Sequence, residues 1–189
     1  LLDPDGFMTG VRAAERNRAH RLIEELMVAA NECVARMLVW GRQLGIFRVH
    51  ERPSAGKLAE LQAVLEEFDL TLRGDLEELP PSELQRVLDD IVGRPEERFL
   101  QTLVLRALAR AAYLPECKGH YALATDFYLH FTSPIRRYPD LVVHRFLGEL
   151  LAGRTLKGAE RELAAGELAD LAGSCSFTER RAEEAEREV

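Results

Sequence analysis

Two adjacent arginines, Arg136 and Arg137, follow a Ser-Pro pair in the stretch HFTSPIRRYPD, which ends at Asp140. Ser-Pro favours the start of a helix, because the serine can cap it and the proline ring fixes φ. Cations near the positive end of a helix cost about 0.3–1 kcal/mol each unless an anion is present. Backbone donors and planar guanidinium groups together suit a phosphate. Two alternatives follow: a phosphate-binding turn, or structural ion pairs with Asp126 or Asp140.

The proline at position 139 constrains the same stretch. Pro139 biases Tyr138 away from the α conformation and would remove an early helical hydrogen bond. We therefore expect one tight turn over residues 133–138, followed by a longer helix that begins near Pro139.

A predicted helix over residues 15–44 carries polar residues on one face, with His20, Glu24 and Asn31 spaced four and seven apart. The opposite side carries an apolar stripe typical of a core-facing surface. This stripe consists of Leu22, Leu26, Ala29, Ala30, Cys33, Val34, Met37 and Leu38. Glu24 and His20 could form an acid and base pair or a hydrogen-bonding surface for a ligand. A solvated helix face is the simpler alternative.

A second group of carboxylates lies near the C-terminus on one helical face, at Glu179, Glu183 and Glu186. These side chains could bind a metal or accept hydrogen bonds. Arginines at positions 180, 181 and 187 are interleaved with them, so a salt-bridged surface helix is the simpler interpretation. The sequence has no H-E-x-x-H, no glycine-rich phosphate loop and no G-x-S-x-G. These residues therefore complete no catalytic site by themselves.

The chain of 189 residues has a formal net charge of −7, with 47% hydrophobic and 30% charged residues. These proportions are typical of a globular domain, and no apolar run approaches the roughly 20 residues of a membrane span. The acidic balance argues against broad binding to polyanions, so any contact with nucleic acid should be local. Three cysteines without a C-x-x-C pair predict neither disulfides nor a zinc site, and reduced thiols favour a cytoplasmic location.

The remaining elements follow from periodicity and from turn residues. Gly45 should end the first helix. We then expect a strand at 46–50, helices at 54–68, 82–92 and 95–113, an extended segment at 121–131, and helices at 141–151 and 156–189. Gly173 is expected to interrupt the last helix. The chain starts without methionine and stops inside a predicted helix, so we expect part of a longer protein whose α-rich fold belongs to the α+β class.

With its flanks, the opening stretch resembles a known family. The run GHYALATDFYLHFTSPIRRYPDLVVHR, from Gly119 to Arg145, is similar to the hallmark region of the RNase II / RNase R exoribonucleases. Two further segments match in the expected order, NRAHRLIEELMVAANECVARML from Asn17 and CSFTERRAEEAEREV from Cys175. The resemblance spans nearly the whole chain, is highly specific in Thr-Ser-Pro-Ile-Arg-Arg-Tyr, and is closer to RNase R than to RNase II.

The resemblance implies that residues 1–189 are the α-rich C-terminal half, with a few strands, of an RNB-type catalytic domain. The family hydrolyses single-stranded RNA processively in the 3′→5′ direction to nucleoside 5′-monophosphates, with Mg²⁺ held by aspartates. We expect those aspartates in an upstream half that this chain needs as a partner, and no flanking OB-fold modules within the chain. The intact protein would then be an exoribonuclease, with this segment alone inactive. The alternative is a non-catalytic RNA-binding or scaffold member.

The resemblance also assigns individual residues. Arg136 matches the family's arginine at the scissile phosphate, and Glu186 matches an active-site glutamate. Glu24 matches a residue that contacts the RNA sugar and favours ribose, because a carboxylate can accept a hydrogen bond from the 2′-OH. Arg137 and Tyr138 are further candidates for RNA binding, and no metal ligand is carried over. Two positions depart from the family pattern, Ala122 and Glu188, where glycine and aspartate are usual.

Overall fold

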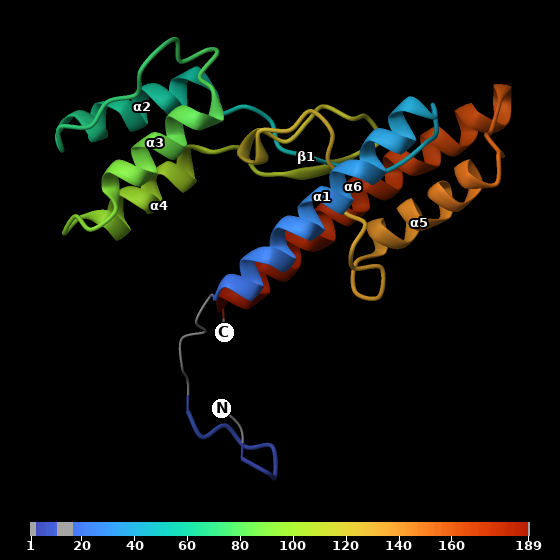
Figure 1. Ribbon diagram of the computed structural model, residues 1–189, viewed down its shortest axis with the longest axis horizontal. Coiled ribbons are helices and arrows are strands. Elements are labelled where there is room, and N and C mark those ends of the chain that lie inside the picture. Colours follow the sequence, from blue (N-terminus) through green and yellow to red (C-terminus); the bar gives the residue numbers. More distant parts are fainter. Residues whose placement is uncertain (1–2, 11–16, 189) are drawn as a thin grey trace.

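The computed structural model describes residues 3–10 and 17–188, and most of its elements are helices (Figure 1). In chain order they are α1 (Arg18–Trp40), β1 (Phe47–Val49), α2 (Ala55–Glu66), α3 (Pro81–Ile91), α4 (Glu97–Ala107), β2 (Ala112–Leu114), the 3₁₀ turn η1 (Tyr121–Leu123), α5 (Tyr138–Leu151) and α6 (Gly158–Glu188). The two strands form an antiparallel sheet. The predicted α-rich fold with a few strands is therefore confirmed.

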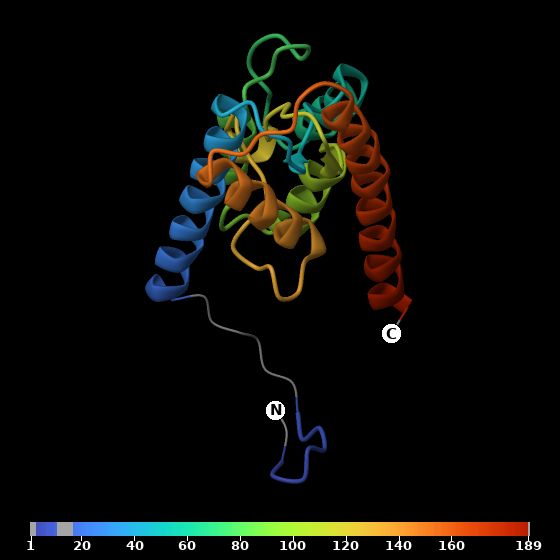
Figure 2. The ribbon, with the colours of Figure 1, turned by 90° about the vertical axis from the view of Figure 1, so that its right-hand side faces the viewer.

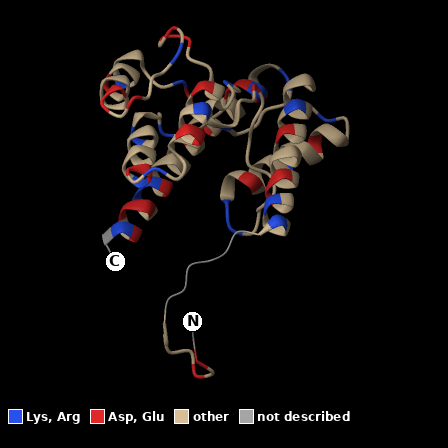
Figure 3. Ribbon diagram, turned by 60° about the vertical axis from the view of Figure 1, so that its left-hand side comes forward, with Lys and Arg blue, Asp and Glu red and all other residues tan. Residues whose placement is uncertain are grey.

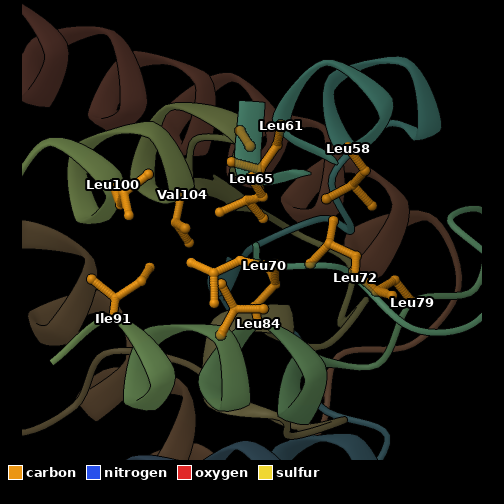
Figure 4. Close-up of a cluster of buried hydrophobic side chains, with 12 residues drawn as sticks. Leu58, Leu61, Leu65, Leu70, Leu72, Leu79, Leu84, Ile91, Leu100 and Val104 are labelled. Carbon is orange, nitrogen blue, oxygen red and sulfur yellow. The ribbon is translucent and has the colours of Figure 1, made fainter. Parts of the chain in front are cut away.

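Helices α2, α3 and α4 form a three-helix unit with its own core. Ser54 caps α2 by accepting a hydrogen bond from the N–H of Lys57, and Pro81 occupies the first position of α3. Leucines at helical spacing then point inward from all three helices (Figure 4). Burying one such side chain contributes about 1.5–3 kcal/mol. The buried members include Leu58, Leu61, Leu65, Leu84, Val87, Ile91, Leu100 and Val104.

Helices α1, α5 and α6 pack around the two-stranded β1–β2 sheet, whose strands are far apart in the sequence. Its register pairs Phe47 with Leu114, Arg48 with Tyr113 and Val49 with Ala112. Helix α6 packs against β2, and α5 packs against both α1 and α6. Figure 2 shows α1 and α6 as two long arms on either side of α5.

The first helix is shorter than predicted. It starts at Arg18, after a capping box in which Asn17 and His20 bond to each other's backbone N–H groups. The predicted start at Glu15 lies outside the described residues. The helix ends at Trp40 rather than at Gly45, because Gly41 caps it and Arg42 adopts a left-handed conformation with φ of 51°.

The side of α1 that faces the core was predicted only in part, since Val34 and Leu38 are the two members of the apolar stripe that are buried. Its buried residues are Asn31, Val34, Ala35 and Leu38. Much of the predicted apolar stripe lies on the opposite, outer side, where Leu22 is 60% exposed and Leu26 is 57% exposed. The expectation failed because the segment before the turn contacts α1 from the side of Asn31, where Tyr128 and Phe131 form hydrogen bonds with the Asn31 amide.

Two further boundaries differ from expectation. The helix predicted at 95–113 stops at Ala107, and Tyr113 lies in β2, because strand pairing with Arg48 outweighs the helical pattern. Helix α6 continues through Gly173, where nothing lies within 4 Å of an added Cβ. Residues 121–131 are extended only after η1, and the Tyr128 carbonyl accepts a hydrogen bond from the N–H of Arg48 over 3.1 Å.

In the described part of the chain, none of the helices combines the length and the apolar content that crossing a membrane requires.

The three cysteines are all unpaired thiols, and burial raises the pKa of both Cys117 and Cys175. A raised pKa keeps a thiol protonated, so neither group is an activated nucleophile at neutral pH.

Candidate functional site

The Ser-Pro-Ile-Arg-Arg segment forms a tight turn that leads directly into α5. The backbone N–H groups of Arg136 and Arg137 donate to the carbonyl oxygen of Ser133 over 3.3 and 3.1 Å. Helix α5 begins at Tyr138, with Arg137 at the N-cap position and Pro139 in the first turn. The predicted turn and helix start are confirmed, although the side chain of Ser133 does not cap the helix.

Asp140, in the first turn of α5, is fully buried and holds this turn together. Its Oδ1 accepts hydrogen bonds from the backbone N–H of Ser133 and from Nη2 of Arg137, each over 2.8 Å. A carboxylate in the first turn also interacts favourably with the helix dipole. One carboxylate oxygen therefore ties both ends of the turn together.

The two arginines consequently have different surroundings. The guanidinium of Arg137 is only 20% exposed and is paired with Asp140. Arg136 is exposed, and it forms no ion pair with any residue that the structure describes. An exposed planar guanidinium can bind phosphate through two parallel hydrogen bonds. Arg137 therefore forms a structural ion pair, whereas the guanidinium of Arg136 is available to bind an anion.

Glu24 lies in the N-terminal half of α1, where all side chains of residues 17–26 are exposed. It precedes Asn31 by seven residues, so the two share one face of the helix. Asn31 contacts the segment before the turn, donating to the Tyr128 hydroxyl over 3.2 Å and accepting from the N–H of Phe131 over 3.0 Å. Glu24 therefore lies on the side of α1 that faces this segment, about 10 Å beyond Asn31.

Glu186 lies in the last turn of α6, where the side chains of residues 180–187 are all exposed. Acidic and basic side chains both occur along this half of the helix (Figure 3). Glu186 follows Glu179 by seven residues and shares its face. Glu179 does not pair within its own helix, because its Oε2 accepts from Nη1 of Arg48 in β1 over 2.6 Å. Glu186 therefore lies on the same side of α6 as the contact with β1.

The fold brings the predicted positions to one side of the molecule. The N-terminal end of α1, the C-terminal end of α6 and the turn before α5 all point the same way (Figures 1 and 2). A pocket of about 410 Å³ separates the turn from α6, and Arg136, Tyr138 and Glu179 are among its lining residues. Arg136 and Glu186 form no ion pair with each other, so both stay open to a ligand between the arms.

Three histidines and two tyrosines form a chain of ring contacts beside the turn. His50 stacks on His120 at 5.0 Å, and Tyr128 meets both His120 at 5.0 Å and His130 at 5.8 Å edge-on. His130 Nδ1 shares a hydrogen bond of 2.9 Å with the Tyr113 hydroxyl. Burial lowers the pKa of His120 to about 4 and that of His130 to about 3, and it raises the pKa of Tyr113 to about 12. His120, His130 and Tyr113 are therefore uncharged at neutral pH.

His120 and His130 are expected to make the chain less stable in acid. Their ordinary pKa is 6.5, so between pH 6.5 and about 4 the unfolded chain binds protons that the folded chain excludes. The free energy of unfolding should therefore decrease as the pH is lowered through this window, by roughly 1 kcal/mol per pH unit for each excluded proton. Urea denaturation across the window measures this slope. A His120→Phe variant should flatten it, and an unchanged slope would contradict the assignment.

The described residues do not fit a magnesium centre by themselves. No group of three or more His, Cys, Asp or Glu side chains is placed to hold a metal ion within this part of the chain. Glu183 and Glu186 share a face of α6, but Mg²⁺ requires near-octahedral oxygen coordination that two carboxylates on one helix cannot complete. No chemical step can therefore be assigned to a metal held by these residues alone.

The sequence patterns missed three residues that shape this site. Asn31 was placed on a polar helix face without a partner, and Arg48 and Ser176 were not singled out. Ser176 is buried, and its Oγ accepts from the backbone N–H of Tyr113 over 2.8 Å. A single arginine between apolar residues of a short predicted strand was the available signal for Arg48. For Ser176 no local signal exists, because its partner lies 63 positions away.

The fold and the turn together define the class of protein. The family model described as RNB domain matches residues 2–153, which include the turn. This match covers most of the chain, and the chain belongs to the RNB domain family. The family resemblance expected from the three sequence segments is confirmed.

Within this family the chain is homologous to Ribonuclease R. It is 40% identical over 185 residues to Ribonuclease R of Escherichia coli (strain K12), which covers 95% of this chain and 23% of that protein. It is also 40% identical over 189 residues to Ribonuclease R of Aquifex aeolicus (strain VF5), covering 100% of this chain and 26% of that protein. The chain thus spans about a quarter of the length of these curated relatives.

Solved structures show the same fold bound to RNA. Mycoplasma genitalium RNase R in complex with double-stranded RNA matches all of this chain at 32% identity with a TM-score of 0.90, over 34% of its own length. The same enzyme with ribose methylated single-stranded RNA matches at 32% identity with a TM-score of 0.89, over 30% of its length. Yeast Ssd1, described as a pseudonuclease, shares the fold with a TM-score of 0.69 at 24% identity, over 86% of this chain and 21% of its own.

Proposed function

We propose that this chain is the C-terminal half of an RNB catalytic domain and forms part of a cytoplasmic 3′→5′ exoribonuclease. The enzyme hydrolyses single-stranded RNA processively to nucleoside 5′-monophosphates. Arg136 contacts the scissile phosphate, Glu186 acts at the active site, and Glu24 contacts the sugar. Arg137 and Tyr138 add to RNA binding from the same turn.

The unequal environment of the two arginines carries this proposal. Asp140 holds Arg137 and the N–H of Ser133, so the turn has a defined shape without using Arg136. Arg136 is exposed in this turn, which lies between α1 and α6 (Figure 2). A cation at such a position can stabilise a phosphate that gains negative charge in a transition state.

The magnesium ligands are proposed to be aspartates in the part of RNB proteins that this chain does not cover. The carboxylates described above are too few for Mg²⁺, and the relatives are about four times as long as this chain. The chain alone is therefore expected to be inactive. Complementation with the aspartate-bearing half should be required for any nuclease activity.

The exposed outer face of α1 supports the proposal that an aspartate-bearing upstream half binds this chain. Its apolar residues Leu22, Leu26, Met37 and Trp40 are 60%, 57%, 40% and 73% exposed. A contiguous apolar stripe that long is unusual on a monomer and marks an interaction surface. We propose that the upstream half of the same catalytic domain packs on this stripe.

A chimera tests the proposed function directly. In Escherichia coli Ribonuclease R, the matching 185 residues would be replaced by this chain. The chimera should release nucleoside monophosphates from the 3′ end of single-stranded RNA in Mg²⁺, whereas this chain alone should not. A chimera that folds and binds RNA but releases no nucleotide would contradict the proposal.

A non-catalytic RNA-binding or scaffold role is the second candidate. The likeness to a protein described as a pseudonuclease, at 24% identity, shows that the fold alone does not decide activity. The chimera separates the two candidates, because both predict RNA binding and only the first predicts nucleotide release.

Glu24→Ala is expected to weaken the preference of the chimera for RNA over DNA. Glu24 lies on the inner face of α1 and can accept a hydrogen bond from the 2′-OH, which DNA lacks. The measured quantity is the ratio of kcat/KM for matched RNA and DNA strands. Glu25→Ala is the matched control, because Glu25 is exposed and points about 100° away around the helix. An unchanged ratio in Glu24→Ala would remove Glu24 as the sugar contact.

A further inference from the structure

Arg48 of β1 links two distant parts of the chain. Its Nη1 lies 2.6 Å from Oε2 of Glu179, and the two side chains are 14% and 32% exposed. The other ion pairs among the described residues join partners no more than five positions apart. The same guanidinium lies 4.7 Å from the ring centre of Tyr113, its cross-strand partner in β2. A guanidinium held by both a ring and a carboxylate has a defined orientation.

Among the described side chains of α6, Glu179 is the last that is held by a residue outside the helix. Before it, Leu168 and Ala172 are buried in one cluster with Ile46 and Tyr113, and Ser176 bonds to the backbone of Tyr113. After it, all side chains of residues 180–187 are exposed. The final two turns therefore project as an arm, and Glu186 lies about 10 Å beyond Glu179 along the helix.

Glu179 also faces the turn before α5. Glu179 and Arg136 line the same pocket of about 410 Å³, from α6 and from the turn before α5. A small tilt of α6 at Glu179 would therefore change the distance between Arg136 and Glu186. A misplacement of about 1 Å in a catalytic group can cost about 10²-fold in rate.

We propose that Arg48 and Glu179 are positioning residues whose ion pair clamps α6 to strand β1 and thereby sets Glu186 opposite Arg136. This role rests on the proposed function for its catalytic consequence. The clamp itself is a property of the chain and is measurable without activity.

Spin labels on this chain measure the clamp. Ile135→Cys and Ala185→Cys, both at exposed positions, would carry the labels in a background whose three native cysteines are replaced by serine. With the ion pair intact, the distance between labels should have one narrow distribution. Glu179→Gln, which keeps an oxygen acceptor but removes the charge, should broaden it, and Arg48→Lys should do the same. Glu184→Gln, on the other side of α6, should leave it narrow.

Kinetic measurements on the Ribonuclease R chimera test the effect of the Arg48–Glu179 ion pair on catalysis. Glu179→Gln should lower kcat by about 10- to 10²-fold, with KM for single-stranded RNA nearly unchanged, and Glu179→Asp should recover part of the loss. An unbroadened distribution in both pair variants, or a loss confined to KM, would overturn the clamp. If the unmodified chimera releases no nucleotide, the proposed function fails, and the label distances still decide whether the clamp exists.

Discussion

Arg136→Ala is expected to lower the turnover of the Ribonuclease R chimera on single-stranded RNA by about 10²–10³-fold. The physical reason is that an exposed, unpaired guanidinium can stabilise the charge that develops on the phosphate in the transition state. Binding of the RNA chain depends on many contacts, so its affinity should change little. Single-turnover rates with saturating enzyme measure the chemical step, and equilibrium binding without Mg²⁺ measures the affinity.

Two variants control this experiment. Arg106→Ala removes an exposed arginine from α4, in the separate three-helix unit, and should leave turnover unchanged. Arg136→Lys keeps the charge but loses the planar fork that matches phosphate, so it should restore only part of the rate. Turnover of Arg136→Ala near that of the unmodified chimera would remove Arg136 from the active site.

Asp140→Ala is expected to lower the free energy of unfolding of this chain by about 3 kcal/mol, at the lower end of the range for a broken buried ion pair. The substitution leaves the guanidinium of Arg137 without its partner at 20% exposure, and the N–H of Ser133 without its acceptor. The lower end applies because Arg137 retains some contact with water. For a chain of this size the loss corresponds to a fall in Tm of roughly 6–12 °C.

Denaturation of three variants separates charge from hydrogen bonding at this position. Asp140→Asn keeps an oxygen acceptor for Ser133 and should lose less stability than Asp140→Ala. Asp126→Ala removes an exposed carboxylate that forms no ion pair with either arginine, and it should change stability by less than about 0.5 kcal/mol. Equal losses for Asp126→Ala and Asp140→Ala would show that Asp140 does not hold the turn.

The sequence predicts a set of candidate site residues but not their arrangement in space. The motif around Arg136, with Glu24 and Glu186 far from it in sequence, identified positions that the fold brings to one side of the molecule. Their roles remain predictions. The sequence could not tell which arginine Asp140 would pair with, because both lie within reach of a side chain at the start of the same helix.

Local signals in the sequence determined where several elements begin and end. Ser54 caps α2, Pro81 starts α3, and Pro139 fixes the start of α5, because capping and the proline ring act within a single turn of backbone. The motif of the turn likewise identified the family. These features depend on neighbours in the sequence, so they can be predicted without the fold.

Only the tertiary structure decided which surfaces are buried. Helix α1 turns Asn31 inward and Leu22 outward, against its apolar pattern, because Tyr128 and Phe131 form hydrogen bonds with the Asn31 amide on that side. Tyr113 leaves a helical pattern for a strand because Arg48 and α6 bind it there. Burial and ion pairing depend on groups up to 131 positions away, as for Arg48 and Glu179, and no local pattern encodes such a partner.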